Sequence, residues 1–232
     1  MSRKSVDPLV LLDQAVAQEK VPRALATKVR KRMNIVQGAV QRVEKASTLS
    51  YPPYYVEPSL PCSKTGAEYG QMGVLFARVI PTTVTGSVVI LVQFSAALVA
   101  FGTKGTIEAV AAHEFTHYVD LVRRLSTKNI ASDEKVTTLF EASFKDAEHT
   151  VPPRLLFSER ALVSLISRKF KGDLMDSALS KKAEDQWVAK DLPIHWVSLE
   201  ENMLKVPMTL VAATRFDPAV LAKIEEMQKA LS

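Results

Sequence analysis

Residues 109–120 read AVAAHEFTHYVD, and they are the most informative part of the sequence. Small apolar residues and the absence of proline and glycine favour an α-helix here. His113 and His117 are four positions apart, so a helix places both imidazoles on one face, one turn apart. Glu114 lies about 100° further around such a helix. The H-E-x-x-H spacing therefore gathers two nitrogen donors and a carboxylate within five residues.

This spacing predicts a zinc site. Two imidazole nitrogens one turn apart can occupy adjacent corners of a tetrahedral Zn²⁺ site. We expect Glu114 to act as general base toward a water molecule that the metal activates, and then to protonate the leaving amine. With four histidines in 232 residues, the pattern arises by chance in roughly 0.4% of such chains. The alternative is a helix with two satisfied histidines and a surface glutamate.

A catalytic zinc needs a third protein ligand. The extended pattern H-E-x-x-H-x-x-G-x-x-H is excluded, because Asp120 and Arg123 stand at its glycine and third histidine. We expect the ligand to come from a helix over 134–148, and to be Glu141, which lies 24 residues after His117 among apolar neighbours. The other candidates for this ligand are Glu148, His149, Glu159 and Glu184.

The motif residues resemble those of a known family. The sequence HEFTH resembles the active-site helix of the zincin metallopeptidases, and of their gluzincin branch in particular. The longer form, which ends in Asp120, is similar to the motif of lethal-factor-like peptidases, and residues 140–144 (FEASF) resemble the segment that holds their glutamate ligand. The spacing is also close to that of thermolysin-like enzymes, although their carboxylate four residues past the ligand is not matched. The resemblance covers about 87–146.

The resemblance implies a zinc metallopeptidase with an α+β, zincin-like core, in which a small mixed β-sheet packs on the active-site helix. It also implies that a peptide substrate lies extended beside an edge strand, either 87–94 or the strand before it. A catalytically silent zincin-fold protein, serving as a regulatory or interaction module, is the main alternative.

Apolar runs and turn residues predict the elements around the motif. Strands are expected over 54–56, 72–80 and 87–94, with a hairpin connection over 81–86. The motif helix is expected over 106–125 with Thr106 as its cap.

The chain divides into three predicted segments. Residues 1–48 form a basic segment of two helices, 8–20 and 22–46. Residues 49–150 form the catalytic core, and 151–232 form a C-terminal helical subdomain broken by glycine and proline.

Charge gives a weaker indication of a partner. The chain has 30 basic and 25 acidic residues, a net charge of +5, and the excess lies in residues 1–50. This helical basic face could bind nucleic acid, or it could be a solvated surface. The residues that form it are Lys28, Arg30, Lys31, Arg32 and Arg42.

The single cysteine, Cys62, excludes an intrachain disulfide, and no targeting signal is visible, so we predict a cytoplasmic protein. Residues 79–103 carry no charge and are long enough to span a membrane. Their proline, threonines and glycine instead predict strands and a short helix, with no membrane span.

Three further residues have possible roles in the site. A zincin needs a donor for the developing oxyanion, for which His195 is preferred over His149, Tyr118 and Arg215. Asp120 either orients an imidazole or lies on the helix surface. Cys62, in a predicted loop, is either a resting-state zinc ligand or an ordinary thiol.

Overall fold

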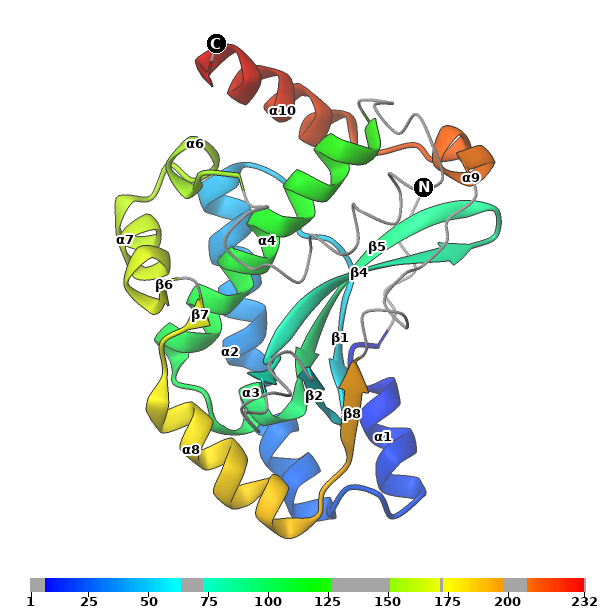
Figure 1. Ribbon diagram of the computed structural model, residues 1–232, viewed down its shortest axis with the longest axis vertical. Coiled ribbons are helices and arrows are strands. Elements are labelled where there is room, and N and C mark those ends of the chain that lie inside the picture. Colours follow the sequence, from blue (N-terminus) through cyan, green and yellow to red (C-terminus); the bar gives the residue numbers. More distant parts are fainter. Residues whose placement is uncertain (1–6, 64–72, 127–150, 172, 198–207, 232) are drawn as a thin grey trace.

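The computed structural model describes residues 7–63, 73–126, 151–171, 173–197 and 208–231. It confirms the predicted α+β class, with helices packed around small mixed sheets. Figure 1 shows helix α4 (Lys104–Ser126), which carries the H-E-x-x-H motif, crossing the middle of the molecule. The helices α2, α7 and α10 and the strand β4 all pack against it. Every residue from Thr106 to Thr116 is buried, so α4 is a central element on all sides.

The N-terminal segment forms the two predicted helices, α1 (Val10–Ala17) and α2 (Arg23–Ser47). Helix α1 is shorter than expected. Helix α2 begins after Pro22 and ends at Thr48, whose backbone is left-handed with a φ of 61°. Its buried stripe recurs every three or four residues and packs against α3 and α4. This stripe includes Val29, Met33, Val36, Val40 and Val43.

The first sheet combines β1 (Tyr54–Glu57), β4 (Ala77–Val84) and β5 (Ser87–Ser95) in the order β1-β5-β4. Strand β5 pairs parallel with β1 and antiparallel with β4. Residues 87–94, one of the two expected edge strands, are therefore central. Within the described part of the chain, β4 is the edge strand on that side.

The predicted hairpin connection over 81–86 is too long. Only Thr85 and Gly86 form the turn, and their φ values of 43° and 78° match a two-residue hairpin turn with left-handed backbone. Pro81 lies inside β4, opposite Ile90. A proline has no N–H to donate, and an edge strand tolerates this because one side of its backbone needs no partner in the sheet.

Strand β5 leads directly into helix α3 (Ala96–Phe101), whose first turn is capped by the Ser95 hydroxyl, 3.1 Å from the Leu98 nitrogen. In α4 the Thr103 hydroxyl accepts from the Thr106 nitrogen at 3.1 Å. The prediction that Thr106 caps this helix is therefore wrong, because the helix begins two residues earlier. Residues 79–103 form strands and a short helix, and no described helix has the length and apolar character needed to cross a membrane.

A second sheet has the order β3-β2-β8, and its strands are β2 (Leu60–Ser63), β3 (Gly73–Val74) and β8 (Ile194–Val197). Cys62 lies on β2 and not in a loop. The remaining elements are α6 (Pro153–Leu156), α7 (Arg160–Lys169), the hairpin β6 (Phe170–Lys171) and β7 (Asp173–Leu174), α8 (Ser177–Gln186), the 3-10 helix η3 (Val188–Lys190), α9 (Met208–Ala213) and α10 (Pro218–Leu231). Residues 151–232 thus contain short strands that the sequence did not predict. Side chains from the N-terminal, central and C-terminal parts share one hydrophobic core.

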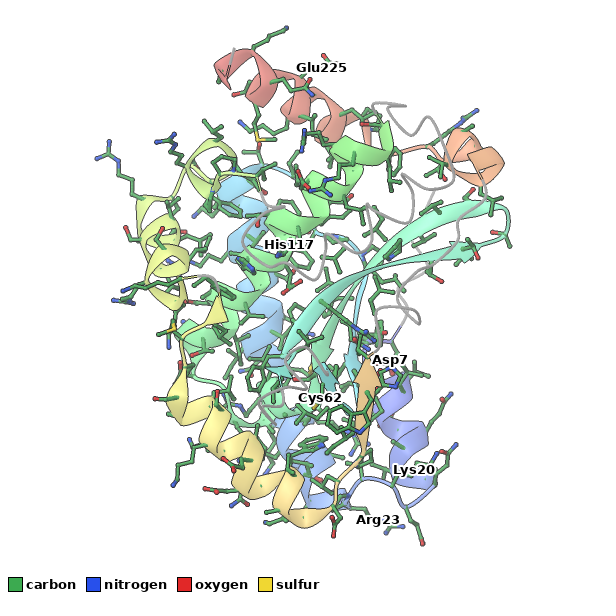
Figure 2. The ribbon with its side chains drawn as sticks, viewed as in Figure 1. Asp7, Lys20, Arg23, Cys62, His117 and Glu225 are labelled. Carbon is green, nitrogen blue, oxygen red and sulfur yellow. The ribbon has the colours of Figure 1, made fainter. Side chains whose placement is uncertain are left out.

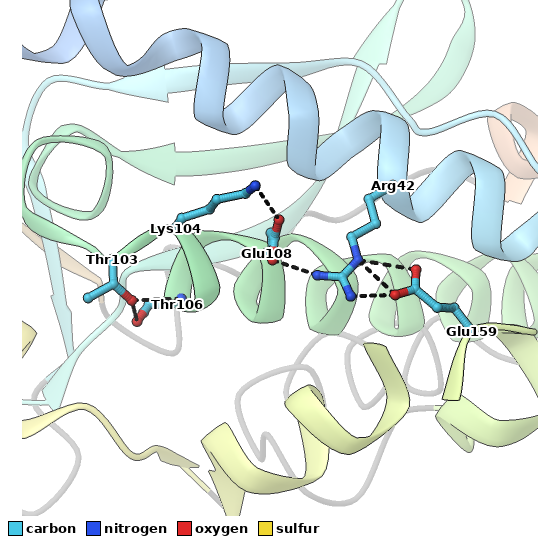
Figure 3. A network of polar contacts seen from close by, with 6 residues as sticks. All are labelled: Arg42, Thr103, Lys104, Thr106, Glu108 and Glu159. Atoms are coloured by element: carbon cyan, nitrogen blue, oxygen red, sulfur yellow. Dashed lines mark hydrogen bonds and ion pairs between the residues drawn. The ribbon is translucent and has the colours of Figure 1, made fainter. Parts of the chain in front are cut away.

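An ion-pair network joins α2, α4 and the start of α7 (Figure 3). The Arg42 Nη1 atom donates to Glu108 at 2.6 Å, and its Nε atom donates to Glu159 at 3.1 Å. The Lys104 Nζ atom lies 3.8 Å from the Glu108 carboxylate. Hydrogen bonding to Arg42 lowers the pKa of Glu159. Arg42 therefore compensates for the burial of Glu108 and ties three helices together.

We expect Arg42→Ala to lower the free energy of unfolding at pH 7 by about 1–3 kcal/mol, because it leaves the buried Glu108 carboxylate poorly paired. Urea denaturation measures the change. Arg30→Ala is the matched control, since Arg30 pairs with Asp13 on the exposed surface, and should cost less than about 1 kcal/mol.

The effect of Arg42→Ala should depend on pH. The folded pKa of Glu159 is lowered, so its contribution is fully present above the ordinary glutamate pKa of about 4.3 and is lost as pH falls through the folded value. The stability difference between parent and variant should therefore shrink between about pH 5 and pH 3. A difference that stays constant over this range would contradict the assignment.

Candidate metal centre

The two motif histidines point toward each other on α4. Their Nε2 atoms are 3.1 Å apart, and their rings meet edge to face with centroids 4.7 Å apart. His113 is buried, with 7% of its surface exposed, and His117 is half-buried. Figure 2 labels His117 on α4 near the centre of the view. The helical spacing thus produces the convergence that the sequence predicts.

This geometry fits two ligands of one zinc ion. Two imidazole nitrogens bound to tetrahedral zinc at about 2.0–2.1 Å lie about 3.3 Å apart. The observed 3.1 Å is close to this value. The same distance suits a hydrogen bond between two neutral imidazoles, with a direction set by their tautomers.

Glu114 lies in the same turn and is buried, with 6% of its surface exposed. The Tyr51 phenol is close to it: burial first, and then the charge of Glu114, raise the pKa of Tyr51 well above its usual value. The Tyr51 hydroxyl donates to the Ala111 carbonyl at 2.9 Å, and its ring stacks on Phe115 at 5.4 Å. Tyr51 therefore fixes the turn of α4 that precedes His113, a role that the sequence did not indicate.

The third ligand stays a prediction. Glu141, together with Glu148 and His149, lies outside the described residues. Glu159 is bound by Arg42, and Glu184 is exposed on α8. Among the side chains that the structure describes, no group of three or more His, Cys, Asp or Glu is arranged to hold a metal.

Asp120 is engaged by arginines of its own helix. It is buried, and its carboxylate lies 2.7 Å from Arg123 and 2.7 Å from Arg124. Burial lowers the pKa of Arg124, and the charge of Asp120 opposes that effect. These contacts support a structural role for Asp120 over one in orienting an imidazole.

The candidate oxyanion donors lie in different places. His195 is exposed on β8, opposite Pro61 in the second sheet. No described hydrogen bond or ring contact joins it to α4. Arg215 is exposed, whereas Tyr118 is half-buried on α4 beside His117, with its ring 5.6 Å from Phe115. Of these donors, Tyr118 lies nearest the motif in the chain, and the prediction for His195 gains no support.

Cys62 belongs to the second sheet, away from the residues of the motif in the chain. It is fully buried on β2, and burial raises its pKa to about 11. Such a thiol stays neutral near pH 7. The Sγ atom contacts the Leu60 carbonyl at 3.5 Å. This environment supports the interpretation of Cys62 as an ordinary buried thiol.

An aromatic side chain from the C-terminal segment completes the described part of the site. The Phe170 ring on β6 stacks on the His113 imidazole, with centroids 3.8 Å apart and planes 12° apart. Nothing in the sequence pattern pointed to this contact, because Phe170 is 57 residues beyond His113 and belongs to no recognisable motif.

Most of the basic residues of α2 have partners inside the fold. Lys28 lies over the Phe101 ring, 4.3 Å from its centroid, and Arg32 donates to the Val99 carbonyl at 2.7 Å. Arg30 pairs with Asp13, and Arg42 forms the network described above. These contacts explain much of the local positive charge without a polyanionic partner.

Comparisons with protein-family models, with curated proteins and with solved structures gave no match. The resemblance to zincin metallopeptidases therefore depends on the two motifs alone.

Proposed function

We propose that the protein is a zinc-dependent metallopeptidase with a zincin-like core. The observation that carries this proposal is the convergence of the His113 and His117 Nε2 atoms, 3.1 Å apart, on a buried helix with Glu114 in the same turn. His113 and His117 would hold the zinc together with Glu141.

The chemistry divides between the ion and the chain. Bound zinc polarises the scissile carbonyl and lowers the pKa of a coordinated water to about 7. Glu114 accepts a proton from the attacking water and delivers it to the leaving amine. The position of Glu114, one residue after His113, keeps its carboxylate off the face that the two imidazoles share, as a general base beside the metal requires.

Strand β4 is the best candidate for the substrate-binding edge. It packs against α4, and among the described residues it is one of the two edge strands of the first sheet, the other being β1. An extended peptide can add to such an edge through main-chain hydrogen bonds, with side chains alternating between the two faces. Apart from Arg78 and two threonines, β4 presents apolar side chains, which favours apolar or mixed peptide substrates.

The metal content of the purified protein tests this proposal. We expect about one zinc per chain, and cleavage of a mixed peptide library that stops on chelation and returns when zinc is restored. The absence of zinc after reconstitution would contradict the metallopeptidase assignment. Stoichiometric zinc without cleavage of any peptide would instead favour the catalytically silent regulatory module.

A further inference from the structure

The β6–β7 hairpin lies against the face of α4 that carries His113. Phe170 is its first residue, and its ring covers one side of the imidazole at 3.8 Å between centroids. The two rings are nearly parallel, 12° apart. A stacked ring contacts only the face of an imidazole and does not occupy a ring nitrogen.

A second contact anchors the same segment. Asp176, just after the hairpin, accepts from the Thr106 hydroxyl at 2.5 Å and from the Lys169 ammonium at 2.9 Å. It also caps α8 by accepting from the Leu179 nitrogen at 3.0 Å. Thr106 and His113 are seven residues apart, so they lie on one side of α4, two turns from each other. The segment from Lys169 to Asp176 is therefore held to α4 at two points.

We propose that Phe170 is a positioning residue for His113, whose stacked ring holds the imidazole plane so that Nε2 faces Nε2 of His117. The proposal rests on the proposed zinc site. An imidazole turns easily about its bond to Cβ, because that torsion has broad minima. The edge-to-face arrangement of the two histidines requires a particular plane for each ring. Phe170 supplies this restraint, and its removal lowers zinc affinity without removing a ligand.

Zinc affinity of Phe170 variants tests the proposal, measured by competition with a chromophoric chelator. Phe170→Leu keeps the apolar bulk but removes the aromatic plane, and we expect it to raise the Kd for zinc about tenfold, in the range of other outer contacts of metal ligands. Phe170→Ala should raise it at least as much. Phe170→Tyr should stay within about threefold of the parent, because the stacked ring is kept.

The matched control is Leu174→Ala, because Leu174 is the cross-strand partner of Phe170 in the same hairpin. We expect its zinc affinity to stay within about threefold of the parent. The visible absorption spectrum of the Co²⁺-loaded protein should change for Phe170→Leu but not for Leu174→Ala, since it reports ligand geometry. Thermal unfolding of each variant shows whether a lower affinity reflects loss of fold.

A metal-free measurement tests the stack itself, and the zinc affinities of parent and variant separate failure of this inference from failure of the proposed function. In the parent, the proton signals of the His113 ring should be shifted by the ring current of Phe170, and Phe170→Leu should remove the shift. If the parent binds zinc but a folded Phe170→Leu binds it equally well, the positioning role is overturned and the peptidase proposal stands. If the parent binds no zinc, both are overturned, whatever the ring signals show about the stack.

Discussion

Glu114→Gln is expected to lower kcat/KM for peptide cleavage by about 10²–10⁴ while the zinc content stays at the parent level. The amide has the shape of the carboxylate, but it cannot accept a proton from the attacking water. Glu114 is buried in the same turn as His113. Because glutamine has the size of glutamate, the substitution should leave the packing of α4 largely unchanged. Steady-state kinetics and elemental analysis on one preparation give both quantities.

Glu108→Gln is the matched control for this substitution. Glu108 is also a buried glutamate of α4, but its carboxylate is bound by Arg42 at 2.6 Å. We expect Glu108→Gln to lower the free energy of unfolding and to keep kcat/KM within a few fold. If Glu114→Gln retained more than about a tenth of the parent activity, Glu114 would not be the general base.

His113→Ala is expected to remove zinc from the purified protein. It takes away one of the two nitrogens that lie 3.1 Å apart, and a single remaining histidine with one carboxylate leaves the coordination too incomplete for a stable catalytic site. His195→Ala is the control, because His195 lies on β8 in the second sheet and should not affect the zinc content. Equal zinc in His113→Ala and the parent would place the metal elsewhere.

The dissociation constant for zinc identifies the third ligand. Glu141→Ala should raise the Kd for zinc by more than about 100-fold. This exceeds the roughly 10–100-fold loss of affinity that follows when a residue contacting a metal ligand is removed. Glu159→Ala should leave the Kd unchanged and lower stability, since Glu159 is bound by Arg42. A Glu141→Ala variant that binds zinc as tightly as the parent would exclude Glu141 as a ligand.

The elements with a strong local signal were predictable. The period of α2, the continuous apolar run of β5 and the composition around His113 each determine an element through its own residues. The hairpin connection at Thr85 and Gly86 was predicted too long, over 81–86, because Pro81 usually ends a strand. Only the sheet order shows that β4 lies at an edge, where proline is tolerated.

Helical spacing predicted that His113 and His117 lie together, whereas the tertiary contacts around them could not be predicted. His113 and His117 lie close together because they are four positions apart on one helix. The stack of Phe170 on His113 carries no local pattern, because packing brings together residues 57 positions apart. The prediction of a partner for the basic residues of α2 was limited in the same way. A charge count does not show that Arg42 faces two glutamates of the same molecule.

The position of Arg42 also has a consequence for biosynthesis. Its partner Glu159 is 117 residues further along the chain. At about 5–20 residues per second, a ribosome completes that stretch roughly 6–23 seconds after Arg42 has been added. Before then Glu108 and the helices α3 and α4, which pack against the buried stripe of α2, have already been added, so α2 lacks only the Glu159 part of the ionic network. The ionic network therefore becomes available in two stages during synthesis, with Glu108 first and Glu159 last.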